Sequence, residues 1–179
     1  MDCCVRLNNI NTHKISVQIT MIVKTNAARI LDKLNIPYEL RTYEVDMDEH
    51  QSAVDVAEAI GIAPEKIYKT LVLKGQQDPY IVAVIPGNAN LDLKKIAKAS
   101  GNKNCEMLPM KDLQAITGYI RGGCSPIGMK KQFPTFVEEL STLEDAIVIS
   151  AGKRGLQIVI NPADLAKAIE LSFTDLVVQ

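Results

Sequence analysis

The sequence contains no tryptophan, and aromatic residues make up only 4% of its 179 residues. The hydrophobic core must therefore be built from Ile, Leu, Val and Ala. The formal net charge is −1, which excludes a generally basic nucleic-acid-binding protein but leaves room for a local basic patch. The chain has no apolar run near the ~20 residues that a membrane-spanning helix needs, and no signal-peptide pattern.

Metal-binding and disulfide patterns are also missing. The cysteines lack a C-x-x-C pair and a histidine partner at metal-ligand spacing, so we expect free thiols, a cytoplasmic protein and no metal or other cofactor. We expect both histidines to be solvated surface residues. The residues concerned are Cys3, Cys4, Cys105, Cys124, His13 and His50.

The common catalytic motifs are absent as well. There is no P-loop, no G-x-G-x-x-G opening a helix after a strand, and no G-x-S-x-G elbow. Two poorly placed histidines make a Ser-His-Asp or Cys-His arrangement improbable. An enzyme of this composition would depend on positioning and electrostatics, with a nucleophile that the substrate brings.

The pattern of apolar residues and turns predicts a single α+β or mixed α/β domain over residues 21–179. Residues 1–20 differ in composition, so we expect an N-terminal extension that is disordered or loosely added to a sheet edge. Strands alternate with helices, and hairpins outnumber β-α-β units. The expected strands are Tyr38–Val45, Ile67–Lys74, Tyr80–Ile85, Cys105–Leu108, Phe133–Val137, Ala146–Ser150 and Leu156–Ile160. Helices are expected after the caps Thr25 and Ser52, from Pro64, Pro109 and Pro162, and around Leu91 to Ala97 with an end near Ser100.

A glycine-rich stretch, Gly118–Lys131, holds four glycines and three cations in fourteen residues. It is either a surface turn or a cleft lined by backbone that binds a ligand, because glycine allows close approach to the backbone. Successive amides near Gly122 and Gly123 could bind an anion.

Two further stretches have a structural and a functional interpretation. Lys69-Thr70 begins an apolar strand, where the lysine either extends to water or points into a cleft as a fixed cation. Ser150–Gly155 is either a solvated hairpin tip or a contact for a nucleic-acid phosphate.

These stretches, taken together and in order, resemble the YbaK family of cysteinyl-tRNA(Pro) deacylases, which is related to the editing domain inserted in bacterial prolyl-tRNA synthetases. The resemblance runs from about Met21 to the C-terminus. Its motifs are Thr42-Tyr43-Glu44, Tyr68-Lys69-Thr70-Leu71, Leu91-Asp92-Leu93-Lys94-Lys95, Gly118-Tyr119, Gly122–Lys131 and Ser150–Leu156.

The resemblance implies a mixed, partly barrel-like sheet with flanking helices. It also implies trans-editing: removal of cysteine from mischarged Cys-tRNA(Pro), and also from Cys-tRNA(Cys), with prolyl-tRNA synthetase as a partner. The implied catalytic residues are Lys69 and Gly122. The implied substrate-binding residues are Tyr43, Thr70, Gly123, Ser150 and Gln157, and the candidates for tRNA phosphates are Lys130, Lys131, Lys153 and Arg154. The mechanism proposed for the family is attack by the substrate's own thiol on its ester carbonyl, giving a cyclic thiolactone.

One departure from the family pattern leaves specificity open. Members that clear cysteine commonly carry an acid where Gln157 stands. Editing of another small amino acid, such as alanine, is therefore an alternative, as is a non-catalytic module that binds tRNA or a synthetase. A third alternative is a hydrolase that uses Cys124, although we interpret this cysteine as a packing residue.

Overall fold

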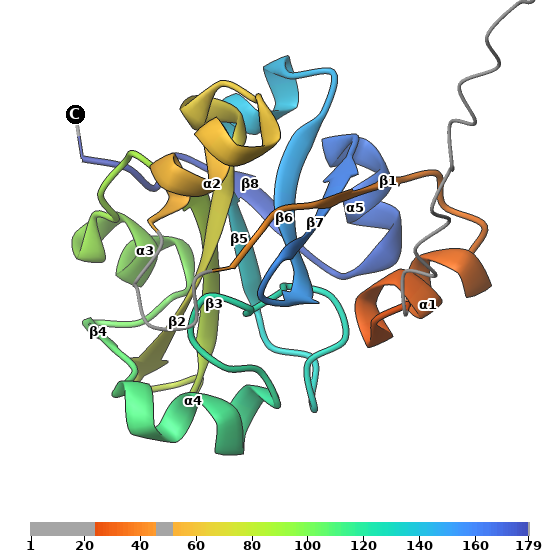
Figure 1. The fold of residues 1–179 in the computed structure, drawn as a ribbon. Coiled ribbons are helices and arrows are strands. Elements are labelled where there is room, and N and C mark those ends of the chain that lie inside the picture. Colours follow the sequence, from red (N-terminus) through yellow and green to blue (C-terminus); the bar gives the residue numbers. More distant parts are fainter. Residues whose placement is uncertain (1–23, 46–51, 179) are drawn as a thin grey trace, which may run out of the picture.

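The computed structural model describes residues 24–45 and 52–178. The predicted extension 1–20, both histidines, Cys3 and Cys4 lie outside these ranges. In the described part, strands form two sheets flanked by short helices, which confirms the predicted mixed α/β class (Figure 1).

The larger sheet is mixed and has the strand order β4-β2-β3-β5-β8. β2 (Tyr68–Gly75) pairs antiparallel with β3 (Ile81–Pro86) and with β4 (Cys105–Met107). β5 (Thr135–Glu138) runs parallel to β3, and β8 (Ser172–Thr174) runs parallel to β5. The β2–β3 hairpin confirms the hairpin predicted for the middle of the sheet.

The smaller sheet is antiparallel, with the order β1-β7-β6. β1 (Glu39–Thr42) pairs with β7 (Leu156–Ile160), which forms a hairpin with β6 (Ile147–Lys153). A parallel bridge between Ile67 and Val148 joins the two sheets beside the start of β2. Within the residues that the structure describes, the two sheets do not close into a barrel, so the expected partly barrel-like sheet is an open mixed arrangement.

The helices begin and end where local chemistry predicts. Thr25 caps α1 (Asn26–Lys33), and Ser52 forms a capping box with Asp55 at α2 (Ala53–Ile60). Glycines in the left-handed backbone conformation, Gly61 and Gly118, end α2 and α4 (Met110–Thr117). The remaining helices are η1 (Pro64–Lys66), α3 (Leu93–Ala99), η2 (Glu139–Leu143) and α5 (Pro162–Ala168).

Two aliphatic cores lie on opposite faces of the β2–β3 hairpin. One joins α1 and α5 to both sheets through residues such as Leu31, Val84 and Leu165. The other packs Ile96 of α3 and Leu176 against Leu73 and Ile85. Successive side chains of β2 point to opposite faces of the sheet, so neighbouring residues such as Lys69 and Thr70 lie in different surroundings.

Candidate active site

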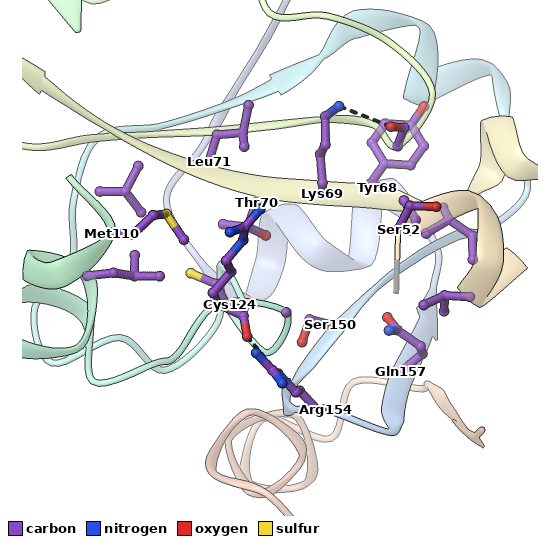
Figure 2. A pocket seen from close by; sticks show the side chains of 18 of the residues that line it. Ser52, Tyr68, Lys69, Thr70, Leu71, Met110, Cys124, Ser150, Arg154 and Gln157 are labelled. Atoms are coloured by element: carbon purple, nitrogen blue, oxygen red, sulfur yellow. Dashed lines mark hydrogen bonds between the residues drawn. The ribbon is translucent and has the colours of Figure 1, made fainter. Parts of the chain in front are cut away.

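A pocket of about 630 Å³ opens between β2, α2, α4, the glycine-rich stretch and the β6–β7 hairpin (Figure 2). Among the eleven predicted site residues, seven line it: Tyr43, Lys69, Thr70, Gly122, Ser150, Arg154 and Gln157. Segments separated by more than a hundred residues thus meet in one cavity.

The other four predicted residues lie outside this pocket. Gly123 is buried against the hairpin, where an added Cβ would stand 3.2 Å from the backbone nitrogen of Arg154. Lys153 is exposed on the hairpin. Lys130 and Lys131 line a separate cavity of about 270 Å³, and the Lys130 ammonium donates to the Ala115 carbonyl at 3.0 Å.

Lys69 lies near the start of β2, with its side chain on the opposite face of the strand from Thr70 (Figure 2). Its ammonium donates to the carbonyl oxygens of Gly87 at 3.0 Å and Ala89 at 2.7 Å. Partial burial lowers the pKa of this ammonium. An ammonium has three N–H donors, so one remains for a substrate oxygen.

Thr70 presents an unpaired group at the pocket. Its hydroxyl oxygen is buried and has no hydrogen-bond partner among the described residues. An unsatisfied buried polar group costs roughly 1–3 kcal/mol. A bound substrate that offers a donor or acceptor here would recover part of that cost.

The glycine-rich stretch is held in place by Tyr119. The Tyr119 hydroxyl donates to the Ile127 carbonyl at 2.6 Å, closing the stretch on itself. The Tyr119 ring also lies against Gly152, where an added Cβ would come within 2.7 Å of Cε1. Gly152 has a φ of 92°, so glycine is required there both by conformation and by space.

Arg154 ties the same stretch to the β6–β7 hairpin. Its Nε donates to the Arg121 carbonyl at 2.9 Å, and its side chain lies beside Gly122, which has a φ of 79°. The Gly123 amide donates to the Ile120 carbonyl at 3.0 Å. No acceptor within the described ranges binds the Gly122 amide, so this N–H is the one of the two glycine amides that is free to bind a substrate oxygen.

Ser150 and Gln157 face each other across the β6–β7 pairing, and both line the pocket. The Ser150 hydroxyl accepts a hydrogen bond from the Gly152 amide at 3.2 Å, which orients it. Gln157 is only 6% exposed, and its side-chain amide bonds to no other described residue. It therefore offers both a donor and an acceptor to a ligand.

The pocket lining is cationic. It carries Lys69, Arg121 and Arg154, and within the described ranges no carboxylate or imidazole lines it. Cys124 supplies the lining with a thiol, but burial raises its pKa to about 12. That thiol is protonated at neutral pH, so it is a poor nucleophile. The described ranges also contain no group of three metal-ligating side chains.

The chain is similar to known proteins over most of its length. The profile of the family described as "Aminoacyl-tRNA editing domain" matches residues 48–168. The chain is also 53% identical over 154 residues to a protein of Enterococcus faecalis named "Putative Cys-tRNA(Pro)/Cys-tRNA(Cys) deacylase EbsC", covering 86% of this chain and 93% of that one.

The chain belongs to the aminoacyl-tRNA editing domain family.

Other similar proteins are more distant in sequence. A proline–tRNA ligase of Brachyspira hyodysenteriae is 23% identical over 139 residues, which are 77% of this chain and 22% of the ligase. A crystal structure described as a "putative trans-editing enzyme for prolyl tRNA synthetase" shares the fold, with a TM-score of 0.76 and 19% identity, covering 86% of this chain and 96% of that one. The predicted family is confirmed. The crystallised protein is a separate chain of similar length, since the match covers 96% of it.

Several lining residues of this editing domain were not singled out from the sequence. Arg121 stands inside the glycine-rich stretch, yet only the hairpin's position shows that it borders the pocket. An apolar end of the pocket, formed by Leu71, Val72, Leu108, Met110 and Leu113, carries no chemical motif. None of the helices in the described ranges is long and apolar enough to cross a membrane.

Proposed function

We propose that this chain is a trans-editing deacylase that removes cysteine from mischarged Cys-tRNA(Pro) and from Cys-tRNA(Cys). The observation that carries the proposal is the chemistry of the pocket. Its described lining orients an ester with three cations and polar donors but supplies neither a base nor an ionised nucleophile. The amino acid follows from the 53% identical relative, whose printed name specifies Cys-tRNA.

The reaction then needs a nucleophile from the substrate, and cysteine brings one. The thiol sulfur attacks the ester carbonyl carbon, the carbon–oxygen bond to the terminal ribose breaks, and the thiol proton passes to the ribose oxygen. The product is a cyclic thiolactone, which water later opens to free cysteine. Well-oriented intramolecular reactions reach effective molarities on the order of 10⁵ M or more, so orientation alone supplies much of the rate.

The pocket residues take the roles that their free hydrogen-bonding capacity allows. In the proposed reaction the Gly122 amide, which bonds to no described backbone acceptor, donates to the carbonyl oxygen as negative charge develops on it. The third N–H of Lys69 binds an oxygen of the terminal nucleotide. Ser150 and Gln157 hold the amino-acid end, with Gln157 accepting a hydrogen bond from the substrate ammonium.

The size and charge of the pocket support a terminal aminoacyl-nucleoside as the ligand. A volume of about 630 Å³ lies within the range of pockets that hold drug-sized molecules, roughly 300–1,000 Å³, and exceeds what a cysteinyl group alone requires. Outside the pocket, Lys153 is exposed on the hairpin that carries Arg154. We place acceptor-stem phosphates along this hairpin, and we expect that binding to weaken with salt.

Editing of alanine is the second candidate, and Gln157 favours it because a neutral amide selects weakly for any one small amino acid. We propose tRNA as the partner in both cases, with prolyl-tRNA synthetase as a protein partner in the cytoplasm.

The deciding experiment is deacylation of tRNA(Pro) charged separately with cysteine, alanine and proline. We expect rapid loss of the cysteinyl form and stable prolyl-tRNA. Faster loss of the alanyl form would favour the second candidate. If all three remained intact, the chain would be a binding module and the proposed activity would be refuted.

A further inference from the structure

The two carbonyl groups that hold Lys69 belong to one short loop, residues 87–92, between β3 and α3. Gly87 is fixed at the near end of this loop. Its amide donates to the Ile67 carbonyl at 2.6 Å, and an added Cβ would meet the Ala53 side chain at 2.3 Å, because α2 packs directly on it. Ala89, which accepts the shorter of the two Lys69 bonds, lies further along.

The far end of the loop is held by the C-terminal segment, residues 175–178. The Asp92 amide donates to the Leu176 carbonyl at 2.7 Å, and the Val178 amide donates to the Asn90 carbonyl at 2.9 Å. Leu91 and Val177 form an antiparallel bridge between these two bonds. Ala89 therefore stands between a bond to Lys69 and a short ladder to the C-terminal segment.

The C-terminal segment is itself firmly anchored. The Leu176 amide donates to the Glu138 carboxylate at 2.8 Å, although Glu138 is only 1% exposed, and the Leu176 side chain is fully buried. The Lys95 ammonium donates to Asp175 at 2.7 Å and to the Val177 carbonyl at 2.7 Å. The C-terminal segment is thus bonded to the core on one side and to the loop on the other.

We infer that the C-terminal segment is a positioning element for Lys69: it fixes the loop whose carbonyl groups hold the ammonium of this pocket-lining residue. This inference rests on the proposed function only for its effect on rate. The Ala89 amide also donates to the Pro86 carbonyl at 3.0 Å, so a local turn remains when the ladder is lost. We expect that turn alone to hold the Ala89 carbonyl less firmly, so that the ammonium turns toward solvent. None of residues 175–178 lines the pocket, so the effect on catalysis passes through Lys69.

A backbone substitution tests this with little change elsewhere. Val178→Pro removes the amide that donates to Asn90, since proline has no N–H. Val178→Ala is the matched control, because it keeps the amide and shortens a side chain that is 56% exposed. A chain ending at Leu176 removes the bridge and the Val178 bond together.

We expect the single-turnover deacylation rate to fall roughly threefold for Val178→Pro and about tenfold for the shortened chain, since small misplacements at a site have large effects on rate. Val178→Ala should match the wild type. In a Lys69→Met background, shortening the chain should lower the residual rate by less than twofold. An equal tenfold loss in that background would show that the segment acts without Lys69 and would overturn the inference.

The titration of Lys69, followed by NMR of its side-chain nitrogen, gives a second readout that does not depend on activity. In the shortened chain the pKa of Lys69 should rise toward its ordinary value, because the ammonium becomes better hydrated. An unchanged titration in a folded, shortened chain would contradict the inference. If the wild-type protein deacylated none of the charged tRNAs, the proposed function would fail. The titration would still test whether the C-terminal segment positions Lys69.

Discussion

Replacing Lys69 by methionine removes the ammonium while keeping most of the aliphatic stem. In the structure this ammonium donates two hydrogen bonds, to the carbonyl oxygens of Gly87 and Ala89, and its third N–H can donate to the substrate. A hydrogen bond from a charged donor contributes about 1.5–3 kcal/mol. If that bond forms in the transition state, its loss lowers kcat/KM roughly 10- to 150-fold.

The assay is single-turnover deacylation of Cys-tRNA(Pro), with unfolding by urea measured in parallel. Lys74→Met is the matched control: Lys74 lies on the same strand, its ammonium is 3.8 Å from Asp112, and it does not line the pocket. We expect wild-type activity in this control. A Lys69→Met protein that is folded and within twofold of the wild-type rate would refute the role given to Lys69.

The pH dependence should report the same group. The rate should rise with pH as the substrate thiol ionises, because an ordinary thiol has a pKa of about 8.5. It should fall again as Lys69 loses its proton, at a pH below the ordinary lysine pKa of about 10.4. The falling limb should disappear in Lys69→Met. Because the folded pKa of Lys69 is lowered, the unfolded state binds more protons between the two values, so this group makes stability rise with pH across that interval.

The remaining predictions concern the pocket wall, the buried thiol and the specificity residue. Gly61 and Gly152 both have positive φ, but only at Gly152 would a Cβ strike the Tyr119 ring, so Gly61→Ala should cost ~1 kcal/mol in urea unfolding and Gly152→Ala ~3 kcal/mol. Cys124→Ser should keep deacylation within about threefold, since burial raises the thiol pKa to about 12; an inactive, folded variant would restore the hydrolase alternative. Gln157→Glu should raise kcat/KM for Cys-tRNA(Pro) roughly fivefold by adding charge to the contact with the substrate ammonium, and a decrease with normal folding would place the ammonium elsewhere.

Local chemistry made much of the fold predictable. Thr25 and Ser52 cap helices as expected, Gly118 ends α4, and the β2–β3 hairpin falls within a residue of its predicted bounds. These features depend on neighbours in sequence. By contrast, the short strand β8 was missed because it forms only by parallel pairing with β5, more than thirty residues away.

Seven of the eleven predicted site residues line one pocket, but the contacts that arrange them could not be predicted from the sequence. Lys69 and Gly122 could be chosen from motifs, whereas the loop that binds Lys69 and the bond that occupies the Gly123 amide could not. Those contacts depend on which face of β2 each side chain points to, and on where the hydrogen bond from Tyr119 holds the glycine-rich stretch. No periodic pattern in the sequence encodes them.

Attack by the substrate's own thiol is tested by comparing the deacylation of tRNA(Pro) charged with cysteine and with serine. Serine has nearly the same size and shape but replaces the thiol by a hydroxyl, which is a far weaker nucleophile near neutral pH. We expect rapid deacylation of Cys-tRNA(Pro), a transient thiolactone that an added amine can trap, and almost no loss of Ser-tRNA(Pro). Equal rates for the two substrates, with no trapped thiolactone, would contradict this mechanism.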